Sequence, residues 1–161
     1  MHDALMGLAQ WLETSPWGGP IRVTTWFYPF IQLIHFTGLS IWLATNVALD
    51  LRLMGVGSWR RTAAEVSEGL FVWNWIGFCI VVTGGFLLFS AAATTLLINP
   101  AFEVKLGMLV PTALLWHVIV QWRARTWGKA PEVPGIGRLA GLIELLLWLA
   151  VVTAAVEIPS Y

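Results

Sequence analysis

The chain has 161 residues, of which 58% are hydrophobic and 11% are charged, and its nine basic and nine acidic residues give a net charge of zero. This length fits one domain. Soluble domains carry about 25% charged residues, so this chain lacks the polar side chains needed to face water on all sides. A net charge of zero offers no electrostatic basis for binding nucleic acid. The single cysteine, Cys79, excludes a disulfide bond within the chain.

The N-terminal segment predicts a short amphipathic helix over residues 3–14. The apolar residues that share one face of it are Leu5, Leu8, Trp11 and Leu12. Their spacing, without a basic start, does not match a signal peptide. Two placements are open: the helix lies in the membrane interface, or it packs against the rest of the chain.

Four further segments are long and apolar enough to cross a membrane as helices. Arg22 and Asp50 bracket 27 uncharged residues, and Glu68 and Glu103 bracket 34 more. Asn99-Pro100 predicts the start of a third helix, since Asn suits the cap and Pro the first helical position. The predicted spans cover residues 25–50, 70–97, 100–123 and 138–157. Short connections make an all-α, integral membrane, up-down four-helix bundle the expected fold, as one transmembrane domain over residues 1–161.

The basic residues predict the orientation of these spans. The loops at 50–69 and 123–138 hold seven of the nine Lys and Arg residues. Cytoplasmic loops carry an excess of Lys and Arg, so both loops are expected in the cytoplasm. Both termini then lie on the opposite side of the membrane.

Ionisable residues inside a span are costly and usually face the bundle interior, so each is a candidate functional residue. With the basic and acidic residues of the loop side as a ruler, His117 and Glu144 each lie six residues inside the membrane, about 9 Å deep. Asn46 and Asn74 lie at the same depth. A carboxylate beside an imidazole favours charging both groups, or sharing a proton. This buried polar layer predicts either a proton or ion relay, or hydrogen bonds that only fix the helix register.

His35 lies deeper, seventeen residues before Arg52, or about 25 Å by the same ruler. Gln32 is one turn earlier, and Thr83, Gly84 and Gly85 are at matching depth on the second span. Gln32 or Thr83 could bond to the imidazole, and the glycines would allow close approach of a helix or a flat ligand. A haem b held between His35 and His117 needs axial ligands at similar heights, which this offset disfavours.

ALDLRLMG, residues 48–55, places Asp50 and Arg52 at the cytoplasmic mouth of the first span. We expect an interfacial pair in which Arg52 extends to lipid headgroups, with docking of a partner as the alternative. The chain has no phosphate loop, CxxC, HExxH or serine elbow.

YPFIQLIHFTGLSIWLATNVALDLRLMG (28–55) and INPAFEVKLGMLVPTALLWH (98–117) carry a resemblance that covers most of residues 24–120. They resemble an uncharacterised family of small bacterial four-helix integral membrane proteins and, more loosely, the membrane domain of copper-resistance D-type proteins. The resemblance implies a multi-pass protein of the bacterial inner membrane. In that membrane, the orientation predicted from the Lys and Arg residues makes both termini periplasmic. The histidines of the family match His35 and His117, and the resemblance does not say what they bind.

The sequence therefore predicts a non-catalytic inner-membrane component without enzymatic activity of its own. It would work in the lipid bilayer with a redox or transport partner, or as a homo-oligomer. Two alternatives stay open: haem b electron transfer through His35, His117 or both, and proton-coupled or metal-ion transport through the layer around His117 and Glu144. The sequence identifies no particular cofactor or metal ion.

Overall fold

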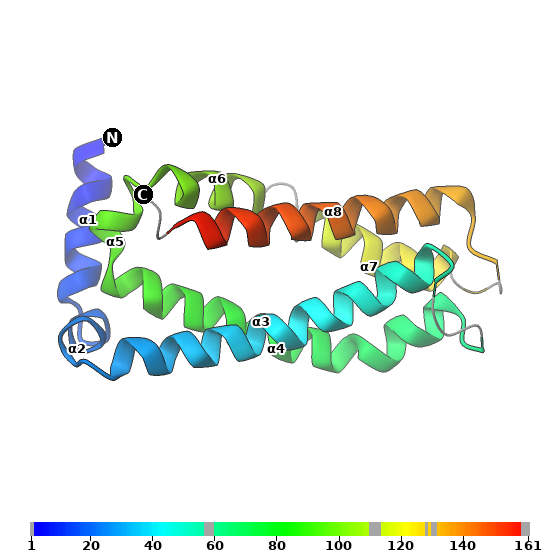
Figure 1. Ribbon diagram of the computed structural model, residues 1–161, viewed down its shortest axis with the longest axis horizontal. Coiled ribbons are helices and arrows are strands. Elements are labelled where there is room, and N and C mark those ends of the chain that lie inside the picture. The colour runs from blue at the N-terminus through cyan, green and yellow to red at the C-terminus, as the bar shows by residue number, and fades with distance from the viewer. Residues whose placement is uncertain (1, 57–59, 110–113, 128, 130–131, 159–161) are drawn as a thin grey trace.

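The computed structural model describes residues 2–56, 60–109, 114–127, 129 and 132–158, and every regular element among them is a helix. Figure 1 shows the longest helices running side by side along the molecule. In chain order the helices are α1 (His2–Thr14), α2 (Gly18–Val23), α3 (Phe27–Leu53), α4 (Ala63–Ala91), α5 (Ala93–Leu96), α6 (Pro100–Met108), α7 (Leu115–Trp127) and α8 (Gly135–Glu157).

Three of the described helices, α3, α4 and α8, are long and apolar enough to cross a membrane. The predicted span over 100–123 is described as two shorter helices, α6 and α7. Residues 110–113 between them, including Pro111, lie outside the described residues. The predicted span over 70–97 also differs, because α4 begins earlier, at Ala63, and ends at Ala91, where α5 takes over.

Local signals account for two of the helix starts. Thr62 and Glu65 form a reciprocal capping box, which begins α4 seven residues before the predicted span. Asn99 caps α6 by accepting a hydrogen bond from the amide of Phe102 at 3.0 Å, with Pro100 next to it at the start of the helix. The start predicted at Asn99-Pro100 is confirmed.

Glycines allow α3 and α4 to pack with their backbones close together. A Cβ atom at Gly77 would lie 2.7 Å from the backbone nitrogen of Trp42, and one at Gly38 would lie 2.6 Å from that of Val81. No larger residue fits at such distances unless the helices separate. Small residues that admit close helix approach are typical of interfaces between membrane helices.

The other helices pack around this pair. α8 crosses α3 near Gly141, where a Cβ atom would lie 3.0 Å from the carbonyl oxygen of Asp50. α7 contacts both α4 and α8, and α6 contacts α8. A central apolar cluster of Trp42, Val81, Trp148 and Val151 joins α3, α4 and α8 halfway along the molecule.

The two ends of the molecule differ. α1 begins and α8 ends at the same end, which we call the termini end, and the chain passes from α3 to α4 and from α7 to α8 at the opposite, loop end (Figure 1). At the termini end α1 lies across the long helices. Ala9 and Leu12 pack against Ala93, whereas Leu5, Leu8 and Trp11 stay exposed. The helix thus docks through one edge and presents its other apolar residues outward.

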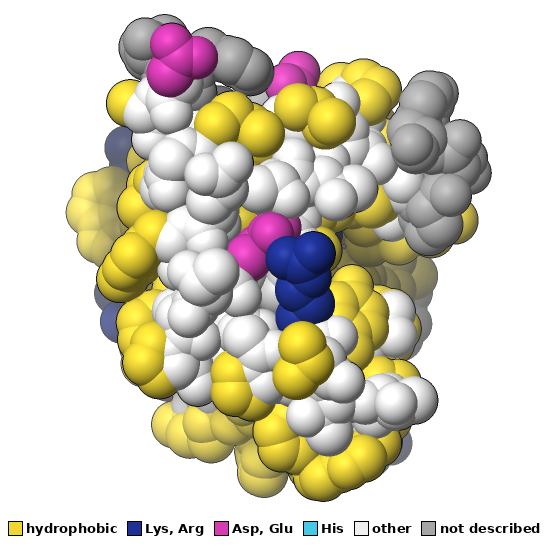
Figure 2. All heavy atoms as spheres, turned by 90° about the vertical axis from the view of Figure 1, so that its left-hand side faces the viewer, with side chains coloured by type: hydrophobic (Ala, Val, Ile, Leu, Met, Phe, Trp, Pro, Cys, Tyr) yellow, Lys and Arg dark blue, Asp and Glu magenta, His cyan; other side chains and the backbone are white. Residues whose placement is uncertain are grey.

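Figure 2 looks at the termini end and shows an acidic and a basic side chain side by side amid hydrophobic and uncharged surface. The ion pair of this end joins Arg22 and Glu13 at 2.6 Å. Glu13 also accepts hydrogen bonds from the amide and hydroxyl of Thr94, at 2.8 and 2.6 Å. Burial raises the pKa of Glu13, but these hydrogen bonds and Arg22 together hold it below its usual value.

Candidate functional site

The structure brings the four residues of the predicted polar layer together in the loop-end half of the bundle. Asn46 comes from α3, Asn74 from α4, His117 from α7 and Glu144 from α8, and none is more than 3% exposed. Each of these four helices contributes one of the four residues. We call these four residues the polar cluster.

His117 lies at the centre of the polar cluster. Its Nδ1 is 2.6 Å from Oε1 of Glu144, and its Nε2 is 3.2 Å from Oδ1 of Asn74. The indole N–H of Trp148 also donates to Oε1 of Glu144, at 3.3 Å. The rings of Trp42 and Trp148 stand edge to face against the imidazole, with centroids 5.8 and 6.0 Å away. His117 is therefore held on all sides by polar bonds and aromatic walls.

The hydrogen bonds around Asn74 orient its side-chain amide. The Thr45 hydroxyl donates to the carbonyl of Trp42 at 2.8 Å, so its oxygen can only accept from Asn74. The Nδ2 group of Asn74 accordingly donates to Thr45 at 2.9 Å and to Oδ1 of Asn46 at 2.5 Å. The Oδ1 atom of Asn74 is then turned to His117 and requires a proton on Nε2. Nδ1 faces the carboxyl of Glu144, and a proton in this contact can be bound to either group.

Asp50 joins the polar cluster, which the sequence analysis did not predict. Its carboxyl is 1% exposed and lies within hydrogen-bond reach of the carboxyl of Glu144. The predicted interfacial pair with Arg52 is wrong, because α8 crosses α3 at Gly141 and covers Asp50. Arg52 is itself buried and donates to the carbonyl of Arg61 at 2.6 Å. The four-residue spacing from Asn46, which places Asp50 on the same helix face, was the available signal.

Two acceptors in this contact lack a donor. Oδ2 of Asp50 and Oε2 of Glu144 are buried and have no hydrogen-bond partner among the described residues. A hydrogen bond between two carboxyls requires a proton on one of them. One shared proton would leave the carboxyl pair with a single negative charge, which a protonated His117 would balance. Neutrality matters here because an uncompensated charge in a buried site is strongly destabilising.

Two further buried atoms of the described region, Nε1 of Trp42 and Nδ2 of Asn46, are donors without a partner. Trp42, Asn46 and Asp50 recur every four residues along one face of α3. The unsatisfied atoms thus comprise two donors and two acceptors. Such a mixture suits water, which both donates and accepts and is held in proteins by two to four polar partners.

His35 lies apart from the polar cluster, in the termini-end half of α3. Its Nδ1 is 2.8 Å from the backbone carbonyl of Val81 on α4. A Cβ atom at Gly84 would lie 2.9 Å from the His35 Cβ, and one at Gly85 would lie 3.2 Å from its ring. Gly84 and Gly85, which the sequence placed at the depth of His35, therefore lie against the His35 side chain. Gln32 and Thr83 are not its hydrogen-bond partners in the described structure, and Thr83 is exposed.

The two histidines are separated along the bundle. His117 packs against Trp42, which follows His35 by seven residues on α3, or about 10 Å along the helix axis. Both ring nitrogens of His117 are already bonded, so binding haem iron would require breaking the bond to Glu144 or to Asn74. Within the described residues, no group of three or more His, Cys, Asp or Glu side chains is placed to hold a metal ion.

No protein-family model, curated protein or solved structure matches the chain. The chemistry of the polar cluster is therefore the basis for a functional proposal.

Proposed function

We propose that the chain crosses the bacterial inner membrane four times as an up-down bundle, with α6 and α7 together forming the third crossing. The position of both chain ends at the termini end supports this topology (Figure 1). The excess of Lys and Arg in the two connections at the loop end supports a cytoplasmic loop end and periplasmic termini.

Within this bundle, we propose that Asp50, Glu144 and His117 form a buried proton site. The observation that carries the proposal is the continuous contact from Asp50 through Glu144 to His117, in residues that are each at most 3% exposed. Ionisable residues are rare inside membrane spans and mark proton and ion pathways. Asp50 lies three residues from the end of α3 and is the member nearest to the loop end.

Apolar side chains enclose the site toward both ends of the bundle, and the buried residues Leu53, Ala63, Ala124 and Val133 lie toward the loop end. The apolar cluster of Trp42, Val81, Trp148 and Val151 lies between the polar cluster and the half of the bundle that contains His35. A proton on this site would be stored rather than passed across the membrane. This supports the predicted role as a non-catalytic component. A redox or transport partner would have to drive the binding and release of the proton.

Infrared spectroscopy of the purified protein tests this proposal. We expect a carboxyl C=O band at neutral pH that shifts when H2O is replaced by D2O, because the shared proton exchanges with solvent. Asp50→Asn should remove the band. Glu157→Gln, at an exposed position on the same helix as Glu144, should leave it unchanged. Absence of the band from the wild type, or its persistence in Asp50→Asn, would overturn the proposal.

Reconstituted vesicles distinguish storage from transport. Under an imposed membrane potential, the isolated protein should conduct no more protons than empty vesicles. A steady flux that Glu144→Gln abolishes would instead support proton transport through the polar cluster, the alternative that the sequence left open.

A further inference from the structure

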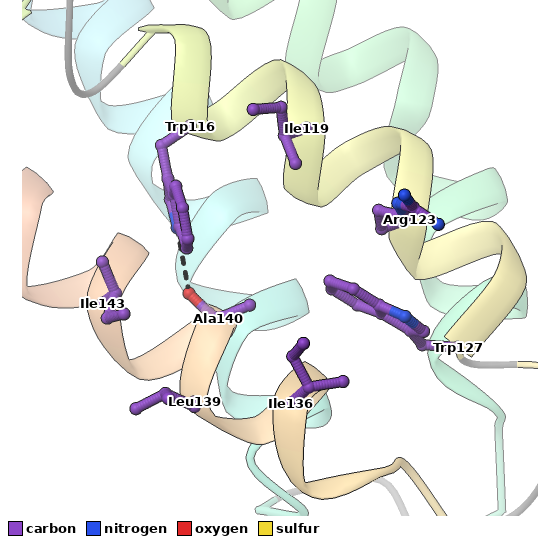
Figure 3. A pocket seen from close by; sticks show the side chains of 8 residues that line it. All are labelled: Trp116, Ile119, Arg123, Trp127, Ile136, Leu139, Ala140 and Ile143. Atoms are coloured by element: carbon purple, nitrogen blue, oxygen red, sulfur yellow. Dashed lines mark hydrogen bonds between the residues drawn. The ribbon is translucent and has the colours of Figure 1, made fainter.

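An apolar groove opens between α7 and α8 at the loop end (Figure 3). Its volume is about 470 Å³, within the range of about 300–1,000 Å³ that is typical of small-ligand sites. Trp116 and Ile119 of α7 form one wall, and Ile136 and Leu139 of α8 form the other. Trp127 and Arg123 lie toward the end of the groove nearest the connection between the two helices.

The indole of Trp116 is already hydrogen-bonded. The indole N–H of Trp116 donates to the carbonyl of Ala140 at 3.2 Å, which turns the apolar ring face to the groove (Figure 3). The charged residue of the lining is Arg123, whose side chain is exposed. Its guanidinium lies 4.9 Å from the centroid of the exposed Trp122 ring, a cation–π contact. The site thus combines a long apolar surface with one cation at its end.

We propose that this groove binds an anionic phospholipid, with one acyl chain along the Trp116 wall and the phosphate headgroup at Arg123. This inference rests on the proposed membrane insertion. An acyl chain complements the apolar walls, and the guanidinium binds phosphate through paired hydrogen bonds. The loop end carries most of the chain's cations, and basic pockets between spans on the cytoplasmic side bind anionic headgroups.

Arg125 provides a matched control two residues further along α7. It has the same charge and is also exposed, but its guanidinium lies 4.9 Å from the centroid of the Phe71 ring on α4, away from the groove. Removing either arginine changes the net charge equally. Removing Arg123 alone takes the cation from the proposed site.

Native mass spectrometry of the full-length protein, released from micelles that contain equal amounts of dioleoyl phosphatidylglycerol and dioleoyl phosphatidylcholine, tests the inference. The wild type should retain phosphatidylglycerol in preference to phosphatidylcholine. Arg123→Gln should reduce the bound phosphatidylglycerol about fivefold, the equivalent of about 1 kcal/mol for one basic residue at an anionic surface. Arg125→Gln should leave it within twofold of the wild type.

Equal retention of the two lipids, or equal losses in Arg123→Gln and Arg125→Gln, would overturn the inference. Leu139→Trp, which fills the groove from an exposed position, should reduce retention of both lipids, and unchanged retention would also contradict the site. None of these variants alters Asp50, Glu144 or His117. Failure of the lipid site and failure of the proton site are therefore distinguishable.

Discussion

His117 and His35 belong to the same apolar bundle, but their hydrogen-bond partners and their exposure differ between the two halves of the molecule. In the loop-end half, His117 has both ring nitrogens bonded to side chains and a carboxylate at 2.6 Å. In the termini-end half, His35 is partly exposed, and one ring nitrogen faces a backbone carbonyl. The first arrangement pairs the imidazole with a buried carboxyl, and the second gives one ring nitrogen a single backbone partner. A histidine within a span is therefore not by itself evidence of a charged or ligand-binding site.

The largest effect should come from removing the charge partner of His117. Glu144→Leu leaves an unpaired imidazolium and a partnerless Asp50 in a buried site, and breaking such a pair costs about 3–5 kcal/mol. Reversible unfolding in mixed micelles would measure this loss, with Glu157→Leu as the control. A loss below about 1 kcal/mol, the value of an exposed ion pair, would show that His117, like His35, has no strong charge partner.

The second effect tests the close packing that positions both histidines. Gly77→Ala places a methyl group 2.7 Å from the backbone of Trp42, whereas Gly85→Ala places one 3.2 Å from the side chain of His35, which can move. We expect Gly77→Ala to destabilise by about 1–3 kcal/mol, as overpacking does, and Gly85→Ala to destabilise less. The same unfolding assay decides the order, and equal losses would contradict the close α3–α4 contact at Trp42.

The third effect concerns His35 alone. His35→Leu removes one hydrogen bond to a carbonyl of α4, and the net contribution of such a bond is about 1 kcal/mol. The infrared carboxyl band of the loop-end half should not change, because the two halves share no polar contact through His35. A loss as large as that of Glu144→Leu, or a changed band, would show that the halves are coupled.

The smallest effect lies outside the spans, at the ion pair of Glu13 with Arg22. Arg22 is 58% exposed, so Arg22→Gln should cost at most about 1 kcal/mol. Because the pKa of Glu13 is held below its usual value of 4.5, its stabilisation is present above that pH and is lost as the pH falls through the lowered pKa. Hydrogen exchange should show α1 loosening under acid, and Glu13→Gln should remove this pH dependence. Identical acid sensitivity in Glu13→Gln would contradict the assignment.

The helical fold was predictable because continuous apolar runs of this length allow little else in lipid. Helix boundaries were less predictable. The acidic first turn of α4 reads as a loop by hydropathy, although the Thr62–Glu65 capping box makes it helical. The division of residues 100–123 between α6 and α7 was also not predicted.

Much of the candidate site could be predicted from the depth of each polar residue along its helix. Counting residues from the charged loops placed Asn46, Asn74, His117 and Glu144 at one level, and the structure brings them into contact. Depth does not give direction around a helix, so Asp50 was assigned to the interface. The partner of His35 could not be predicted, because a backbone carbonyl occurs at every residue and leaves no mark in the sequence.

The central claim is that the polar cluster holds His117 as an imidazolium while His35 stays neutral. Nitrogen-15 NMR of the histidine-labelled protein at neutral pH tests it in one spectrum, with His117→Asn and His35→Leu assigning the signals. We predict two protonated ring nitrogens for His117, and one protonated and one unprotonated nitrogen for His35. An unprotonated ring nitrogen in His117 would reverse the bond to Asn74 and contradict the proposed proton site.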